Sequence, residues 1–187
     1  MIEGREMSLH EIVLPDTKPE TEWVRGRALQ KVSPQRDHGR LQNKFGSALD
    51  AWAGCRGEVA TEWRFRVAPP GELRRPLVPD VAFVSIESLR GKSRAEIQIP
   101  AFAPTVAVEI LSPDDRQDDV DSKIDVYLRA GTELVIVVDS RSQTIGLHDA
   151  ERTSTLTRGD TLSHAALPGF SLDISAYFDD ALRLIEE

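Results

Sequence analysis

Two apolar runs, each interrupted by a single acidic residue, dominate the hydrophobic pattern of the chain. Residues 106–113, with the sequence VAVEILSP, predict a strand that is buried on both faces and carries Glu109 near its end. Residues 75–84, with the sequence RPLVPDVAFV, predict a second apolar strand that contains Asp80. A buried carboxylate costs free energy unless a cation or hydrogen-bond donors meet it. We therefore expect such partners at Glu109 and Asp80.

A helix is predicted directly after the Glu109 strand, over residues 119–130. Four apolar residues share one face of this helix: Val120, Ile124, Tyr127 and Leu128. Lys123 and Asp119 lie at the edge of that face, four residues apart. Because the loop between the strand and the helix is short, Lys123 can reach back over the strand end that carries Glu109. Two acids on neighbouring strands and one lysine predict a divalent-metal site with a lysine beside the metal.

The rest of the pattern predicts a hairpin, a long amphipathic helix and further strands. The hairpin covers residues 22–32, turns at Gly26 and is ended by Ser33-Pro34. The helix covers residues 35–53. The later segments are predicted strands at 58–67, 134–138, 144–148 and 153–157, a polar surface segment at 85–100, closing segments at 168–172 and 174–178, and a short helix at 179–187.

Length and composition suit one domain. The 187 residues of the chain divide into a flexible lead-in at residues 1–20 and a single domain at residues 21–187. Residues 2–5 spell IEGR, a common engineered protease-cleavage sequence, so residues 1–6 are interpreted as an engineered remnant, with chance as the alternative. The sequence shows no signal-peptide core, no membrane-spanning run and a single cysteine, Cys55, so we expect a cytoplasmic protein without a disulfide.

The charge is unevenly distributed along the chain. The net charge is −8, yet residues 1–100 hold 16 basic and 14 acidic residues, whereas residues 101–187 hold 7 and 17. The basic residues concentrate between Arg56 and Arg94, next to the predicted site, where local positive charge can attract phosphate. The acidic run at residues 114–121 would repel a DNA backbone unless it faces away, and it suits the first turn of a helix.

The order of these motifs resembles the Uma-two family of endonucleases. The resemblance extends from about Glu22 to Phe178 and rests on Pro79-Asp80, Val108-Glu109-Ile110-Leu111-Ser112-Pro113, Asp119, Lys123, Tyr127 and Ala130-Gly131. It implies the restriction-endonuclease-like fold of the PD-(D/E)xK superfamily, an α/β (α+β) fold with a central mixed β-sheet flanked by helices. The chain departs from the superfamily motif at Leu111, where a lysine is expected, and the resemblance implies that Lys123 is its displaced substitute.

The resemblance implies a Mg²⁺-dependent endonuclease that hydrolyses phosphodiester bonds of DNA, with Mn²⁺ as a substitute ion and a homodimer as its assembly. The expected metal ligands are Asp80, Glu109 and the carbonyl of Ile110, and Lys123 is the expected catalytic cation. Asp119 is expected to hold Lys123 in place, and Tyr127 to add a hydrogen bond.

Two further residues, Glu22 and His38, match the family and are candidate catalytic residues. The alternative for Glu22 is a solvated acid at a strand edge, and the alternative for His38 is a solvated or capping residue in the first turn of a helix. Glu62 is weighed in the same way, as a metal ligand or as an exposed salt-bridge partner.

Other functions stay open at this point. The chain could be a catalytically degenerate nucleic-acid-binding module, or a metal-dependent hydrolase that acts on RNA or nucleotides. A structural alternative treats Glu109 and Lys123 as a buried ion pair and Asp80 as a strand-end acid, but such pairs rarely add stability over apolar packing. The sequence contains no helix-turn-helix or zinc-finger pattern that would indicate sequence-specific recognition.

Overall fold

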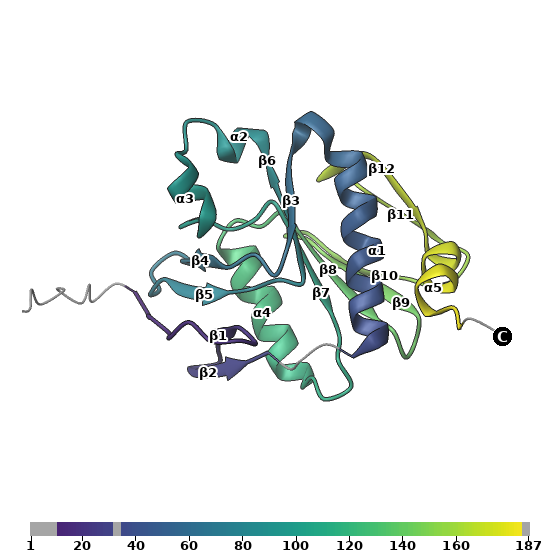
Figure 1. The fold of residues 1–187 in the computed structure, drawn as a ribbon, viewed down its shortest axis with the longest axis horizontal. Coiled ribbons are helices and arrows are strands. Elements are labelled where there is room, and N and C mark those ends of the chain that lie inside the picture. Colours follow the sequence, from purple (N-terminus) through teal and green to yellow (C-terminus); the bar gives the residue numbers. More distant parts are fainter. Residues whose placement is uncertain (1–10, 32–34, 185–187) are drawn as a thin grey trace, which may run out of the picture.

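The computed structural model describes residues 11–31 and 35–184, and a six-stranded sheet forms its centre (Figure 1). The strands are β3 (Gly57–Thr61), β6 (Val81–Ser85), β7 (Val106–Ile110), β8 (Leu134–Asp139), β9 (Thr144–His148) and β10 (Thr153–Leu156), in the order β10-β9-β8-β7-β6-β3. Strands β7 and β8 run parallel, and the other four neighbouring pairs are antiparallel. Helix α4 (Gln117–Arg129) supplies the crossover that a parallel pair needs. The expected α/β (α+β) fold with a central mixed sheet is confirmed.

Two hydrophobic cores lie on opposite faces of the sheet. Helices α1 (Arg36–Ala53) and α5 (Ile174–Leu182) cover one face, and α4 covers the other (Figure 1). Because side chains alternate along a strand, β7 sends Val106, Val108 and Ile110 into the α1 core and Ala107 into the α4 core. Glu109 follows the same alternation, so its carboxylate lies on the α4 face of the sheet.

Three small antiparallel pairs and three short helices complete the described chain. The pairs are β1 (Thr21–Val24) with β2 (Arg27–Gln30), β4 (Phe65–Val67) with β5 (Arg75–Leu77), and β11 (Thr161–His164) with β12 (Leu167–Asp173). The short helices are η1 (Gly54–Arg56), α2 (Ile86–Leu89) and α3 (Arg94–Gln98). The β1–β2 hairpin turns at Arg25-Gly26, near the predicted position, and β1 lies against α4 (Figure 1).

Two of the predicted strands are each divided in two. The predicted strand 58–67 ends at Thr61, because Glu62 adopts φ 51° and the chain leaves the main sheet to form β4. The predicted strand 75–84 is interrupted between Leu77 and Val81, where Pro79 has no N–H for a sheet ladder. The second break leaves Asp80 at the point where β6 enters the sheet.

The end of the chain also differs from the prediction. Residues 174–178 form the start of α5, because Asp173 caps this helix by accepting a hydrogen bond from the backbone N–H of Ala176 at 2.8 Å. Strand β11 was not predicted. Val32, Ser33-Pro34 and the proposed remnant at residues 1–6 lie outside the described residues. Within residues 11–31 and 35–184, no helix has the length and apolar character needed to cross a membrane.

Candidate active site

The site begins with two carboxylates on neighbouring strands. Strands β6 and β7 pair with Val81 opposite Val108, so Asp80 and Glu109 come next to each other in this register. Both residues are buried, at 2% and 7% exposure. The Oδ2 atom of Asp80 accepts a hydrogen bond from the backbone N–H of Ile110 at 2.6 Å, which fixes the carboxylate against β7. The pairing of two sheet strands therefore brings both predicted metal ligands together.

Helix α4 places a cation and a hydroxyl beside Glu109. The Nζ atom of Lys123 lies 2.5 Å from Oε2 of Glu109, and the hydroxyl of Tyr127 donates to Oε1 at 3.2 Å. Lys123 and Tyr127 are four residues apart, so they share one face of the helix. The short loop after β7 thus brings Lys123 back over the strand end, where the sequence analysis placed it.

The β1–β2 hairpin contributes a third carboxylate. Glu22 is 2% exposed, its Oε2 atom lies 3.0 Å from Nζ of Lys123, and its Oε1 atom accepts a hydrogen bond from the backbone N–H of Val78 at 2.7 Å. The alternative of a solvated strand-edge acid is therefore wrong for Glu22. Lys123 bridges Glu22 and Glu109, and these three side chains join the hairpin, the sheet and α4.

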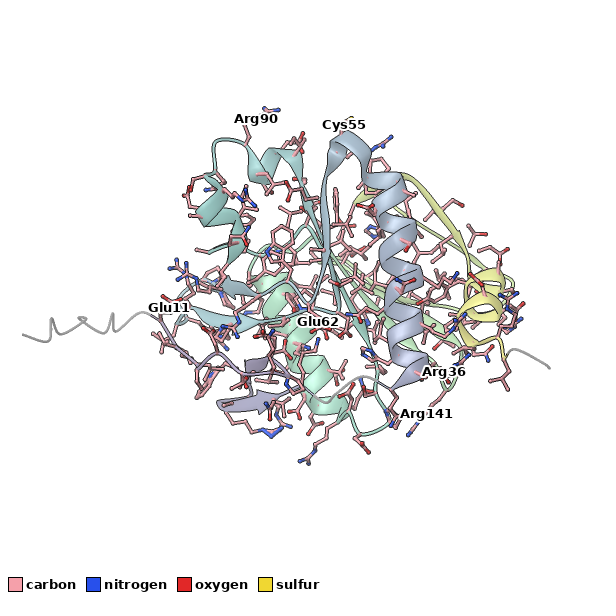
Figure 2. The ribbon with its side chains drawn as sticks, in the orientation of Figure 1. Glu11, Arg36, Cys55, Glu62, Arg90 and Arg141 are labelled. Carbon is pink, nitrogen blue, oxygen red and sulfur yellow. The ribbon has the colours of Figure 1, made fainter. Side chains whose placement is uncertain are left out.

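A second lysine, which sequence reasoning missed, lies beside Asp80. Lys31 follows β2, and its Nζ atom lies 2.6 Å from Oδ1 of Asp80 and 3.0 Å from the carbonyl oxygen of Val78. The signal that could have found it is strand alternation: Glu22 pairs with Leu29, so Lys31, two residues later, belongs to the same face of the hairpin. A partly exposed carboxylate, that of Glu62, reaches the same ammonium at 3.1 Å from just beyond β3 (Figure 2).

Helix α1 adds a histidine and an amide to the Asp80 side of the site. The Nε2 atom of His38 lies 3.5 Å from Oδ2 of Asp80, and its buried Nδ1 atom has no hydrogen-bond partner among the described residues. The side-chain amide of Gln42 donates to the carbonyl oxygen of Asp80 at 2.9 Å and to Glu62 at 2.8 Å. His38 is therefore turned inward to the site. Glu62 forms the salt bridge that was weighed for it.

One expected contact is absent. Asp119 was expected to hold Lys123, but its Oδ2 atom lies 2.5 Å from a guanidinium nitrogen of Arg27, and its Oδ1 atom lies 3.8 Å from Arg25. Helical side chains lean toward the helix N-terminus, which directs Asp119 to the hairpin, whereas Lys123 is drawn to Glu22 and Glu109. Asp119 thus fastens the β1–β2 hairpin to α4.

None of the basic residues between Arg56 and Arg94 lines the cavity of the site. Arg64 pairs with Asp16 and Glu20, and Arg66 pairs with Glu11, so acids of the lead-in offset much of this positive charge. The cations that line the cavity are instead Arg27, Lys31, Arg116 and Lys123. These basic residues therefore do not form the cavity wall, and their attraction of phosphate beside the site stays a prediction.

Burial and close charges strongly perturb the two central carboxylates. Burial, together with the carboxylates of Glu22 and Asp80, raises the pKa of Glu109 to about 7, although the ammonium of Lys123 opposes the shift. Burial would also raise the pKa of Asp80, but Lys31 and His38 outweigh it and hold this pKa well below its usual range. Neighbouring acids thus differ in their affinity for a proton, as is typical of catalytic sites.

The cations of the site are held in their charged forms. Burial lowers the pKa values of Lys31 and Lys123, but the surrounding carboxylates outweigh burial and raise both above the ordinary value for lysine. Asp80 likewise outweighs the burial of His38 and raises its pKa. Two buried, protonated lysines therefore face the carboxylates across the site.

These groups open into a cavity of about 210 Å³, whose wall includes the site residues Glu22, Lys31, His38, Asp80, Glu109 and Lys123. The donor chemistry suits Mg²⁺, because carboxylate oxygens keep further lone pairs after accepting one hydrogen bond. Among the described residues, no three His, Cys, Asp or Glu side chains converge on one metal position. An ion here would use Asp80, Glu109, a backbone carbonyl and water, and Mg²⁺ commonly takes few protein ligands and several waters. The residues present fit such an ion.

A mixed sheet with a parallel β7–α4–β8 crossover, and with acids and a lysine gathered at the end of its central strands, defines the restriction-endonuclease-like class of proteins. The chain belongs to the Uma2 family, whose model is described as "putative restriction endonuclease" and matches residues 9–175. The resemblance found in the sequence is therefore confirmed.

A solved structure agrees with this assignment. The chain is similar to the crystal structure of "a putative nuclease belonging to DUF820" from Anabaena variabilis ATCC 29413, with 25% identity, a TM-score of 0.79, and coverage of 90% of this chain and 94% of that one. It also overlaps with a DrdV–DNA complex at 18% identity and a TM-score of 0.40, covering 77% of this chain and 13% of that one. No curated protein matches the chain.

Proposed function

We propose that the protein is a Mg²⁺-dependent endonuclease that hydrolyses phosphodiester bonds of DNA. The observation that carries the proposal is the convergence of Asp80, Glu109 and Lys123 on one cavity, in a fold and family of nucleases. A buried ion pair alone would not require three carboxylates and two lysines in contact, because burying each charge costs free energy. Hydrolysis of a phosphodiester uses such an arrangement.

Phosphodiester hydrolysis requires an activated water and positive charge near the phosphate oxygens. A bound Mg²⁺ ion would lower the pKa of a coordinated water and neutralise developing negative charge. Asp80 and Glu109 would hold the ion, with the carbonyl of Ile110 as a further ligand. Lys123, fixed between Glu22 and Glu109, can donate hydrogen bonds to the incoming water or to a phosphate oxygen.

Two neighbouring groups position these residues. The hydroxyl of Tyr127 donates to Glu109, which holds the carboxylate in one orientation as it faces Lys123. His38 contacts Asp80 through Nε2 at 3.5 Å and so helps to hold that carboxylate in place. The carboxylates are thus held in place before any substrate arrives, which reduces the cost of ordering them in the reaction.

The test is cleavage of supercoiled plasmid with Mg²⁺ or Mn²⁺ by three proteins: wild type, Glu109→Gln, and the matched control Glu87→Gln, which changes an exposed glutamate on α2. We expect wild type and the control to nick the plasmid, and Glu109→Gln to lose activity on the order of 100-fold or more. EDTA should abolish all cleavage. Cleavage that persists in Glu109→Gln, or in EDTA, would refute the proposed chemistry.

The substrate class needs a separate comparison. Duplex DNA, single-stranded DNA, RNA and a nucleotide are offered to the same proteins under the same metal conditions. Preferential hydrolysis of RNA or of the nucleotide would refute the DNA part of the proposal and leave the metal-dependent chemistry in place. Metal binding without hydrolysis of any of the four would favour a catalytically degenerate module.

A further inference from the structure

The ammonium of Lys31 is surrounded by oxygen atoms from three separate segments. Its Nζ atom lies 2.6 Å from Oδ1 of Asp80, 3.0 Å from the carbonyl oxygen of Val78, and 3.1 Å from Oε2 of Glu62. The side chain of Lys31 is only 14% exposed and lines the cavity of the proposed active site. Two carboxylates and a backbone carbonyl are also the donors that Mg²⁺ and Mn²⁺ prefer. We call these three groups and the space between them the Lys31 cage.

The charges of the site allow a simple count. Four carboxylates are in contact with the two lysines: Glu22 and Glu109 with Lys123, and Asp80 and Glu62 with Lys31. With all six groups charged and His38 neutral, as in alkaline solution, two negative charges remain, and one divalent ion neutralises them. A second divalent ion would leave the buried site with an excess positive charge next to two ammonium groups, which is unfavourable at low dielectric.

We infer that the Lys31 ammonium takes the place of a second divalent ion, so that the site binds one metal ion and carries its other cation on the chain itself. Removal of this ammonium would open the Lys31 cage to a metal ion and leave one more uncompensated negative charge. This inference rests on the proposed metal-dependent function, because it concerns the same carboxylates. It assigns to Lys31 a role different from that of Lys123, which bridges Glu22 and Glu109.

The test is a titration of the metal-free full-length protein with Mn²⁺ alone, without DNA. Binding is measured by calorimetry and by the electron paramagnetic resonance signal of free Mn²⁺. The proteins are wild type, Lys31→Met, and the control Lys92→Met, which makes the same substitution at an exposed lysine. We expect one bound ion in wild type and in the control, and two in Lys31→Met. The first ion of Lys31→Met should bind about tenfold more tightly or better, because one nearby positive charge is gone. An unchanged number of ions and an unchanged affinity in Lys31→Met would overturn the inference.

Two further variants locate the added ion and guard against misfolding. Adding Glu62→Gln to Lys31→Met removes one carboxylate of the Lys31 cage and should abolish the second ion. If that ion persists in the double variant, it lies elsewhere and the inference fails. If Lys31→Met is poorly folded without metal, Mn²⁺ should raise its melting temperature more than that of wild type, whereas Lys31→Arg, which keeps the charge, should behave as wild type does. An equal rise in wild type and Lys31→Met would contradict the inference.

The outcome is separable from that of the proposed function. If wild type binds one Mn²⁺ ion but cleaves nothing while Lys31→Met binds two, the nuclease proposal fails and the role of Lys31 stands. If wild type cleaves DNA with Mn²⁺ and Lys31→Met still binds only one ion with unchanged affinity, the nuclease proposal stands and the role of Lys31 fails. If no variant binds Mn²⁺, the Lys31 cage does not accept a metal ion and the inference is refuted.

Discussion

Replacing Glu109 by glutamine should make the metal-free protein more stable in alkaline solution, even though it removes a proposed metal ligand. Burial first, and then two neighbouring carboxylates, raise the pKa of Glu109 to about 7 in the folded protein, against an ordinary 4.5. Between these pH values the folded protein keeps a proton that the unfolded chain has released. The free energy of unfolding therefore falls as the pH rises through this window. The stabilisation that comes from the proton on Glu109 is complete only below about pH 4.5.

The magnitude follows from the same pKa values. The difference between 4.5 and about 7, at about 1.4 kcal/mol for each factor of ten in proton affinity, corresponds to about 3 kcal/mol. Glutamine keeps nearly the shape of a protonated glutamate and does not ionise, so it avoids this loss. The value is an upper bound, because the substitution also removes one of the two carboxylates that pair with Lys123 and leaves only Glu22, at 3.0 Å.

The assay is urea unfolding of wild type and Glu109→Gln in EDTA, at about pH 4.5 and about pH 8.5. We expect similar free energies of unfolding at the acidic pH and a more stable Glu109→Gln at the alkaline pH. The Glu87→Gln control should follow wild type at both. If Glu109→Gln is destabilised equally at both pH values, Glu109 is a structural ion-pair partner of Lys123, and the reasoning from its burial is refuted.

Three other predictions test separate parts of the structure. Lys123→Met should lower the single-turnover cleavage rate on the order of 100-fold while changing Mn²⁺ affinity much less; unchanged turnover would show that Lys123 is not the displaced motif lysine. Arg27→Ala should lower the free energy of unfolding in urea by about 1–2 kcal/mol, because it leaves the buried carboxylate of Asp119 without its close partner; no loss would mean that this pair does not fasten the hairpin. His164, and then backbone N–H groups, lower the pKa of Asp149 to about 2, so stability from this residue is present above about pH 3.8 and is lost as the pH falls toward 2. Asp149→Asn should therefore lose less thermal stability than wild type as the pH falls from about 3.8 to about 2, and equal losses in the two proteins would contradict this account.

The parts of the site that the sequence predicted depend on short stretches of chain. Glu109 and Lys123 are separated by one strand end, one loop and almost two helical turns, and their contact follows from the reach of Lys123. Tyr127 follows Lys123 by four residues, so its position beside Glu109 comes from helical spacing alone. The hydrophobic pattern likewise predicted β7, α4 and β8, because the two strands are short continuous apolar runs and the helix has a clear helical period.

The parts that were missed depend on how distant segments dock. Lys31 meets Asp80 across 49 residues, and Arg27 meets Asp119 across 92 residues, and both contacts require the hairpin to lie against α4 and the sheet. Strand periodicity gives the face on which Lys31 lies but not the element that this face meets. The broken strand at Glu62 was missed for a related reason, because the positive φ of Glu62 interrupts a run whose apolar alternation continues through Trp63 and Phe65.

The β1–β2 hairpin determines where charge lies in the site without changing how much charge is there. The sheet and the segments that enter it supply Asp80 and Glu109, and α4 supplies one lysine. The hairpin and the residue after it add one acid, Glu22, and one base, Lys31, so their charges cancel. Because each hairpin charge pairs with an opposite charge from another element, a small displacement of the hairpin would separate both pairs at once. The fastening of the hairpin to α4 should therefore influence metal binding as well as folding.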